Sequence, residues 1–266
     1  MKKLRIVAAL LLVASTVLFV GFKFVEKFRY DNQPPEITFM EEALDVSVTA
    51  SEEELLQGVT AQDKKDGDVT ESLVVESMSA FTGEDTRVIT YAASDRHGNV
   101  GRAERKLHYT DYRETRFHFD MPLRFPTGKL KDVLPYITAE SVIDGDITDK
   151  VKYALPDRVN INSLGKYPIE FSVMDSAGNT VCLPTVLEIY DEQMEQIHVE
   201  LKDYLIYIKQ GESFQPETYY QGADQEGTLS LVSDVDVNEP GVYHVDYIVK
   251  NENSIGRSRL IVVVEE

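Results

Sequence analysis

The chain has 266 residues and a net charge of −19 at pH 7. An acidic surface repels phosphate groups, so the charge argues against nucleic acid as a partner. Cys182 is the only cysteine, which excludes an internal disulfide and leaves burial of apolar side chains to hold each domain together.

An apolar segment, residues 6–22, lies close to the N-terminus and has lysine or arginine on both sides. As a helix it would be about 26 Å long, close to the roughly 30 Å of a bilayer's hydrocarbon core. A cleaved signal peptide is the alternative, but no small-x-small cleavage site follows the segment. We therefore predict an uncleaved signal-anchor in a single-pass cell-membrane protein. Its partner through residues 6–22 is the membrane, and its C-terminal part is extracellular.

Residues 23–33 form a basic connector, and the Pro-Pro pair that follows stops any helix. Beyond it, apolar and polar residues alternate along 87–93, 167–173 and 243–249, the pattern of a strand with one face in a core. Each segment runs through a Gly- or Asn-containing turn into a second predicted strand, which indicates a hairpin. The second strands are expected at 103–109, 181–190 and 259–264.

A pair of aspartate motifs occurs twice along the chain. Asp-Gly-Asp-(Val/Ile)-Thr begins at Asp66 and again at Asp144, and Asp-x-x-Gly-Asn begins at Asp95 and again at Asp175. This spacing indicates an internal repeat of about eighty residues, the size of a small β-sandwich rather than a solenoid turn.

The predicted fold class is all-β, with tandem sandwiches after one N-terminal transmembrane helix. The predicted domains are a tail, anchor and connector over 1–33, and sandwiches over 34–110, 111–192 and 193–266. The third sandwich is degenerate because it has lost both aspartate motifs, as terminal repeats often do. Without a disulfide or a long apolar joint, we expect each sandwich to fold alone, with flexible joints near 111–113 and 191–195.

The motifs resemble bacterial immunoglobulin-like domain repeats, of the type found in pesticidal crystal proteins and Gram-positive surface proteins and related to hyalin repeats. The second repeat matches best, at 144–148, 165–167 and 175–179. The first departs at Thr86-Arg87, and the third keeps only 241–247. The resemblance implies immunoglobulin-like sandwiches that serve as spacers or adhesive modules, and it implies no particular ligand.

Six aspartates of these motifs are candidate ligands for a calcium cofactor: Asp66, Asp68, Asp95, Asp144, Asp146 and Asp175. In a sandwich of this type both motifs belong to loops at one pole, where their oxygens could meet. Calcium takes six to eight oxygens, although the spacing is not that of an EF-hand. The alternative is that aspartate and asparagine cap the turns through backbone N–H groups, with glycine at positive φ. The sequence leaves both interpretations open.

Catalytic motifs are absent, and the five histidines are dispersed, so we predict no enzyme and no catalytic residues. The preferred interpretation is a membrane-anchored extracellular protein that acts as a structural or adhesive surface module. One alternative is an accessory subunit that docks an envelope protein or enzyme. Another is a calcium-stiffened carbohydrate or host-ligand binding protein. In each case the expected partner is an extracellular protein or glycan whose binding residues the sequence does not indicate.

Overall fold

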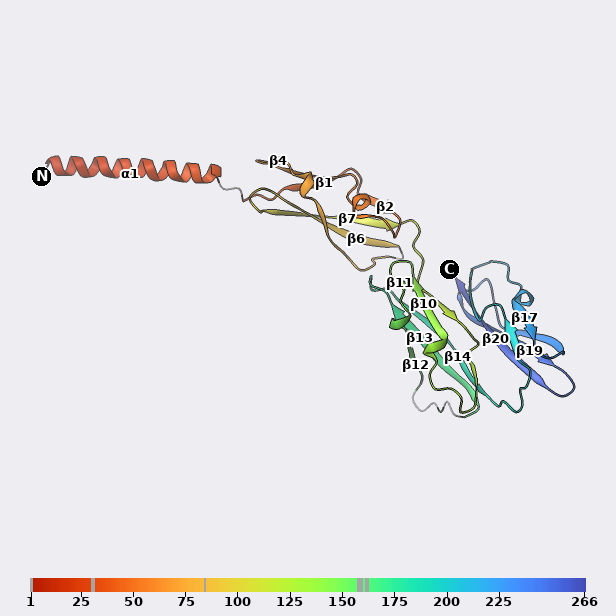
Figure 1. Ribbon diagram of the computed structural model, residues 1–266. Helices are drawn as coiled ribbons and strands as arrows, with labels where there is room; N and C mark the ends of the chain where they lie inside the picture. Colours follow the sequence, from red (N-terminus) through yellow and green to blue (C-terminus); the bar gives the residue numbers. More distant parts are fainter. Residues whose placement is uncertain (1, 30–31, 84, 157–159, 161–162) are drawn as a thin grey trace. The chain divides into compact units, whose positions relative to one another are not determined.

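The computed structural model describes residues 2–29, 32–83, 85–156, 160 and 163–266 (Figure 1). The chain divides into two compact units, Met1–Tyr112 and Arg113–Glu266. The first unit holds the N-terminal helix and one two-sheet sandwich. The second unit holds two such sandwiches. The all-β prediction for the part beyond the helix is confirmed at this level.

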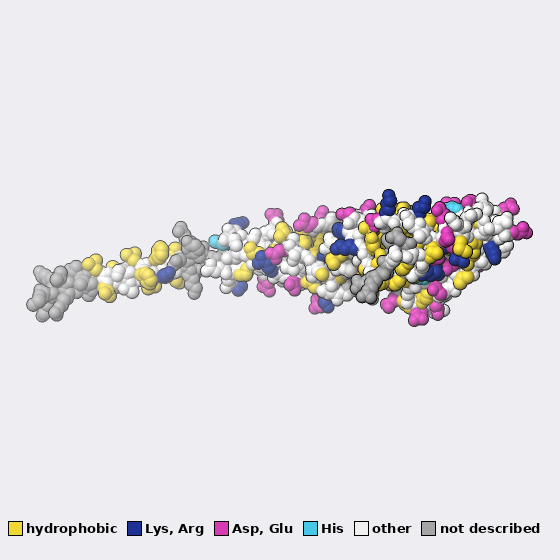
Figure 2. Space-filling view, turned by 90° about the horizontal axis from the view of Figure 1, so that it is seen from below, with side chains coloured by type: hydrophobic (Ala, Val, Ile, Leu, Met, Phe, Trp, Pro, Cys, Tyr) yellow, Lys and Arg dark blue, Asp and Glu magenta, His cyan; other side chains and the backbone are white. Residues whose placement is uncertain are grey.

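Helix α1 (Lys2–Arg29) extends beyond residue 22 and includes part of the expected connector. The large apolar side chains described along it, from Leu10 to Val25, are exposed and give its surface an apolar character (Figure 2). Among the residues that the structure describes, none forms a helix with both the length and the apolar content that a membrane crossing requires. The signal-anchor remains a prediction.

The first sandwich has a three-stranded and a four-stranded sheet. The smaller sheet has the order β1 (Glu36–Phe39), β3 (Val59–Asp63) and β4 (Gly67–Asp68). The larger has the order β2 (Ala43–Val46), β7 (Val100–Tyr109), β6 (Thr86–Ser94) and β5 (Val74–Met78). Short helices lie in the connections: α2 (Glu52–Leu55), which Ser51 and Glu54 cap reciprocally, and η1 (Thr70–Ser72).

The side chains that the alternating pattern predicts to be apolar and inward-facing form the core of the first sandwich. On β6, Ile89, Tyr91 and Ala93 are buried, and on β3 every second residue from Val59 is buried. These side chains meet Leu107 of β7 in one apolar cluster between the two sheets. The period-two prediction for residues 87–93 is therefore confirmed.

The second sandwich repeats the first strand for strand. Its smaller sheet has the order β11 (Gly145–Asp146), β10 (Ile137–Ser141) and β8 (Arg116–Phe119). Its larger sheet has the order β12 (Lys152–Ala154), β13 (Gly165–Met174), β14 (Thr180–Tyr190) and β9 (Arg124–Pro126). The helices η2 (Leu134–Tyr136) and η3 (Thr148–Lys150) flank β10 and β11. The matching strand orders agree with the internal repeat read from the aspartate motifs.

The third sandwich keeps the larger sheet and reduces the smaller one. Its four-stranded sheet has the order β16 (Leu205–Lys209), β20 (Ile255–Glu265), β19 (Gly241–Lys250) and β18 (Thr228–Ser233). Only β15 (Val199–Leu201) and β17 (Tyr220–Ala223) form the second sheet, and η4 (Pro216–Tyr219) precedes β17. Among the described residues, no short strand corresponds to β4 and β11, which carry the Asp-Gly-Asp motif in the other two sandwiches.

The second and third sandwiches share apolar surface, contrary to the expectation that no such interface joins them. Leu205 and Ile261 of the third sandwich lie in the core cluster of the second, beside Phe117 and Phe119. On the opposite face of β20, Leu260, Val262 and Val264 fill the core of the third sandwich. Both faces of one strand are thus buried, and such strands read as continuous apolar runs instead of alternating ones. The run Leu-Ile-Val-Val-Val at 260–264 has this continuous apolar character and is typical of a strand buried on both faces.

Replacing Ile261 by alanine tests this shared strand. The side chain is 2% exposed and belongs to the third sandwich, yet it lies in the core of the second. Because the cavity would relax only in part, we expect residues 113–266 to lose about 2–5 kcal/mol of unfolding free energy. Both sandwiches should unfold in one guanidinium transition.

Val232→Ala is the matched control, because Val232 lies exposed on β18 of the same sandwich. It should change the free energy of unfolding by less than about 0.5 kcal/mol. Two separate transitions, of which Ile261→Ala moves only one, would show that the sandwiches are independent.

Candidate functional site

Asp66 of the first repeat joins two loops at one pole of the sandwich. Asp66, in the β3–β4 loop, accepts the backbone N–H of Arg96 at 2.9 Å through Oδ2, and Arg96 belongs to the β6–β7 turn. Asp68 accepts the N–H of Thr70 at 2.9 Å and holds the start of η1. The two aspartates of one motif therefore serve different contacts.

Asp95 organises the β6–β7 turn. Its Oδ1 accepts the backbone N–H groups of His97 and Asn99, each at 2.8 Å, and its Oδ2 accepts Asn99 Nδ2 at 2.6 Å. Gly98 has φ of +84°, which a side chain would strain. Burial opposes ionisation of Asp95, but the hydrogen bonds from Asn99 and His97 outweigh it and hold its pKa below the usual range. This residue is therefore a charged turn cap.

The second repeat builds the same turns with the other three candidates. Asp144 accepts the backbone N–H of Ser176 at 2.6 Å and also bonds its hydroxyl. Asp146 accepts the N–H of Thr148 at 3.0 Å, and Asp175 accepts that of Asn179 at 2.9 Å. All six candidate aspartates thus hold turns or join loops, which supports the capping interpretation. Whether any of them also binds calcium remains a prediction.

His97, one of the five dispersed histidines, lies beside two of these aspartates. Potential ligand atoms of Asp66, Asp95 and His97 all lie within 4.8 Å of one another. In the part of the chain that the structure describes, no such trio forms around Asp144 and Asp175. The position of His97 in the sequence could have indicated this contact. His97 is the third residue of the Asp-x-x-Gly-Asn motif, where the second repeat has Ala177.

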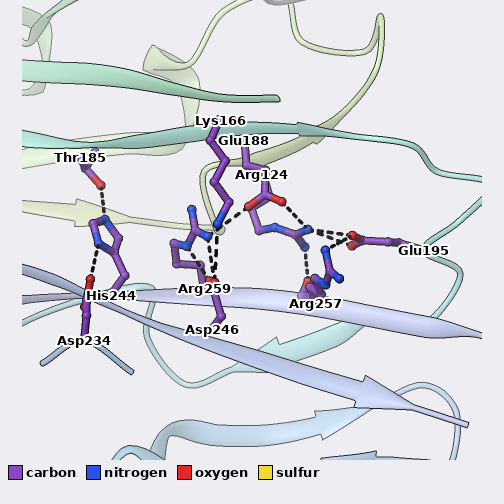
Figure 3. Close-up of polar contacts among 10 residues, drawn as sticks. All are labelled: Arg124, Lys166, Thr185, Glu188, Glu195, Asp234, His244, Asp246, Arg257 and Arg259. Atoms are coloured by element: carbon purple, nitrogen blue, oxygen red, sulfur yellow. Dashed lines mark hydrogen bonds and ion pairs between the residues drawn. The ribbon is translucent and has the colours of Figure 1, made fainter. Parts of the chain in front are cut away.

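A second polar cluster lies at the seam between the second and third sandwiches (Figure 3). Arg124 of β9 pairs with Glu188 of β14 at 3.2 Å and with Glu195 at 2.9 Å. Arg259 of β20 pairs with Glu188 at 3.1 Å and with Asp246 of β19 at 2.6 Å. Both arginines are about 95% buried, at 4% and 5% exposed. Although burial opposes ionisation of Glu188, the guanidinium of Arg124 lowers its pKa.

Sequence reasoning missed this seam cluster. Its members come from segments far apart in the chain and form no motif. Isolated Arg and Glu on alternating strands read as solvent-facing positions. In the folded chain both arginines are buried, and a buried charge needs a partner of opposite sign.

A cavity of about 280 Å³ opens beside the seam cluster. Its lining combines charges of both signs with two valines: Lys166, Val186, Val232, Ser233, Asp234, His244, Asp246 and Arg259. His244 Nε2 lies 3.1 Å from the Thr185 hydroxyl, and its Nδ1 lies 3.9 Å from Asp234 (Figure 3).

The row Thr185, His244 and Asp234 has the order of a hydroxyl–imidazole–carboxylate triad. Its geometry does not support nucleophilic catalysis, because 3.9 Å is too long for the hydrogen bond that would orient the imidazole. Thr185 is also buried, so its hydroxyl is closed to a substrate. The contact between Thr185 and His244 instead ties β14 of the second sandwich to β19 of the third.

No protein-family model matches the chain, and a search of curated proteins finds no match either. Several solved structures align with it at low similarity. The M60 catalytic domain with the CBM51-1 and CBM51-2 domains of Clostridium perfringens ZmpB is 10% identical, with 89% of this chain and 43% of that chain covered and a TM-score of 0.25. The lipoprotein BT2262 from Bacteroides thetaiotaomicron is 12% identical, with 57% and 80% covered and a TM-score of 0.24.

Mouse cadherin-23 EC22-24 is 12% identical, with 88% of this chain and 99% of that chain covered and a TM-score of 0.20. This chain spans less than half the length of the Clostridium protein. At these scores the similarity says nothing about ligand, partner or activity.

Replacing Arg124 by alanine tests the seam cluster. The change leaves Glu188 and Glu195 short of a buried partner, and removal of one member of a buried ion pair costs about 3–5 kcal/mol. Lys150→Ala is the control, because Lys150 has 44% of its side chain exposed and its pair with Asp144 in the same unit is worth about 0–1 kcal/mol. Chemical denaturation of residues 113–266 measures both. Equal losses would mean that the seam charges are solvated.

His244 accounts for a first loss of stability of residues 113–266 as the pH falls. Burial lowers its pKa, as do the positive charges of Arg259 and Lys166, while Asp234 and Asp246 act in the opposite direction. The unfolded chain, with a histidine pKa of about 6.5, therefore binds the proton more readily than the folded one. Stability is full above about pH 6.5 and falls as the pH drops below it.

His244→Gln should remove this first loss and leave the later one. The later loss comes from Glu188 and Asp246, whose lowered pKa values give stability that is present above about pH 4 and lost below it. Melting temperatures of both proteins between pH 8 and pH 3 measure the difference. A wild-type curve that is flat from pH 7 to pH 5 would contradict the assignment.

Proposed function

We propose that this chain is a membrane-anchored structural or adhesive module outside the cell, built from immunoglobulin-like sandwiches. In this proposal α1 is the anchor, and residues 113–266 form a rigid body that meets an extracellular protein or glycan. The observation that carries the proposal is the burial of β20 between two cores, because it joins two sandwiches into one body.

The exposed apolar side chains of α1 support an anchoring role. Leu18, Phe19 and Phe22 are among those left exposed along the helix. Contiguous apolar surface of this kind is costly in water and marks a membrane or protein contact. Lys23 and the basic residues before residue 6 suit the two interfaces of a bilayer, where long basic side chains can extend into water.

The construction of residues 113–266 supports a binding or spacing role. A shared core and a buried ion network resist bending between two sandwiches, and a surface that is already ordered loses little conformational entropy when a partner binds. The charged groups of the seam are engaged with one another, and the buried Thr185 offers no accessible nucleophile. We therefore propose no enzymatic activity for this body.

Membrane retention tests the proposal. The full chain should stay with membranes after a carbonate wash, and protease added to intact cells should degrade residues 113–266. A chain that begins at residue 32 is the control and should be released in soluble form. Recovery of a soluble natural form whose N-terminus lies at Lys23 or beyond would refute the anchor, and protection from external protease would refute the extracellular site.

A further inference from the structure

The two aspartate-rich poles share their turns but differ at several matched positions. Lys64, Lys65 and Arg96 stand in the first pole where the second has Val142, Ile143 and Ser176. Asp63 at the end of β3 corresponds to Ser141 at the end of β10, and His97 corresponds to Ala177. Ser72 of the first repeat takes the place of Lys150. The first pole therefore gains a carboxylate and an imidazole where the second has a hydroxyl and a methyl group, and it has a serine at the position of Lys150.

The lysine provides a positive charge to the second pole, where its Nζ lies 3.3 Å from Asp144 Oδ2. In the first pole, Ser72 instead donates its hydroxyl to the Val69 carbonyl. In the described part of the first pole, the ion pair of Asp66 is with His97, whose Nδ1 lies 3.7 Å from Asp66 Oδ2. Asp66 thus lies beside a titratable imidazole where Asp144 lies beside a lysine ammonium group.

Asp63 adds a buried carboxylate oxygen with no partner. The side chain is 6% exposed, and its Oδ1 accepts the backbone N–H groups of Lys65 and Asp66 at 2.8 Å each. Its Oδ2 is buried and has no hydrogen bond. Ser141 accepts the equivalent two N–H groups through a neutral hydroxyl. The turn alone therefore does not require a carboxylate at this position.

The unpartnered oxygen belongs to the same pole as the trio. Asp63 Oδ1 accepts the backbone N–H of Asp66, a member of the trio. A buried carboxylate oxygen without a hydrogen bond is costly unless a cation or a water meets it. Asp175 also has a buried oxygen without a hydrogen bond, but Ser141 beside that pole is neutral.

We propose that Asp66, Asp95 and His97 bind a divalent transition-metal ion of the zinc type, with Asp63 as the further carboxylate beside them. Their ligand atoms already lie within 4.8 Å of one another and come from two loops. Imidazole nitrogen with carboxylate oxygens is a donor set that suits zinc, whereas calcium takes oxygen ligands alone. The ion would clamp the β3–β4 loop to the β6–β7 turn.

Titration of the full chain in detergent with zinc chloride, after chelator treatment, tests the site. We expect calorimetry to show one ion bound per chain. His97→Ala and Asp66→Asn should each weaken zinc binding at least tenfold. Cobalt(II) should give visible absorption bands of a nitrogen–oxygen site that His97→Ala abolishes.

Two matched variants serve as controls. Asp144→Asn alters the equivalent aspartate of the second repeat, and His108→Gln alters a histidine that lies between Asp45 and Asp85 elsewhere in the first sandwich. Both should keep zinc affinity within twofold of the original. His97 is a surface residue, with 38% of its side chain exposed, so the metal-free His97→Ala protein should melt close to the metal-free original.

Three outcomes would overturn the proposal. The first is absence of zinc binding to the chelator-treated chain. The second is binding that His97→Ala leaves unchanged. The third is calcium binding that is tighter than zinc binding and insensitive to His97→Ala, which would return the site to the oxygen-only class.

Discussion

Burial of β20 on both faces is the constraint on which the second unit depends. Leu260, Val262 and Val264 fill the core of the third sandwich, and Ile261 faces the core of the second. Neither sandwich can expose its side of this strand without losing apolar burial. The seam charges lie at the same contact, where Arg124 and Arg259 are both buried and paired with carboxylates.

The repeats show which parts of the aspartate motifs the fold uses. In both copies the carboxylates accept backbone N–H groups of the turns, and glycine supplies the positive φ. The third sandwich forms its larger sheet without either motif, so the motifs shape the pole and not the sandwich itself. Positions that the turn does not need can then diverge. The replacement of Ser141 and Ala177 by Asp63 and His97 in the first repeat is such a divergence.

The proposed function combines a local feature with a tertiary one. An apolar helix with exposed side chains is suited to a membrane, and the joined sandwiches of residues 113–266 are suited to rigid presentation of a surface. The metal proposed for the first repeat would act on a different element, since it would stiffen a loop pole of the first sandwich. Each feature can therefore be tested without the others.

The sequence alone determined the long hairpin strands and their turns, because these depend on neighbours along the chain. Alternation at 87–93 and 167–173 predicted β6 and β13, and the paired motifs predicted the repeat and its turns. The apolar anchor and any calcium at the six aspartates remain predictions. Only tertiary structure decided the rest. Three features join residues that are distant in the chain: the shared strand β20, the seam cluster, and the contact of His97 with Asp66. A local sequence pattern does not indicate which distant surfaces will pack together and exclude water.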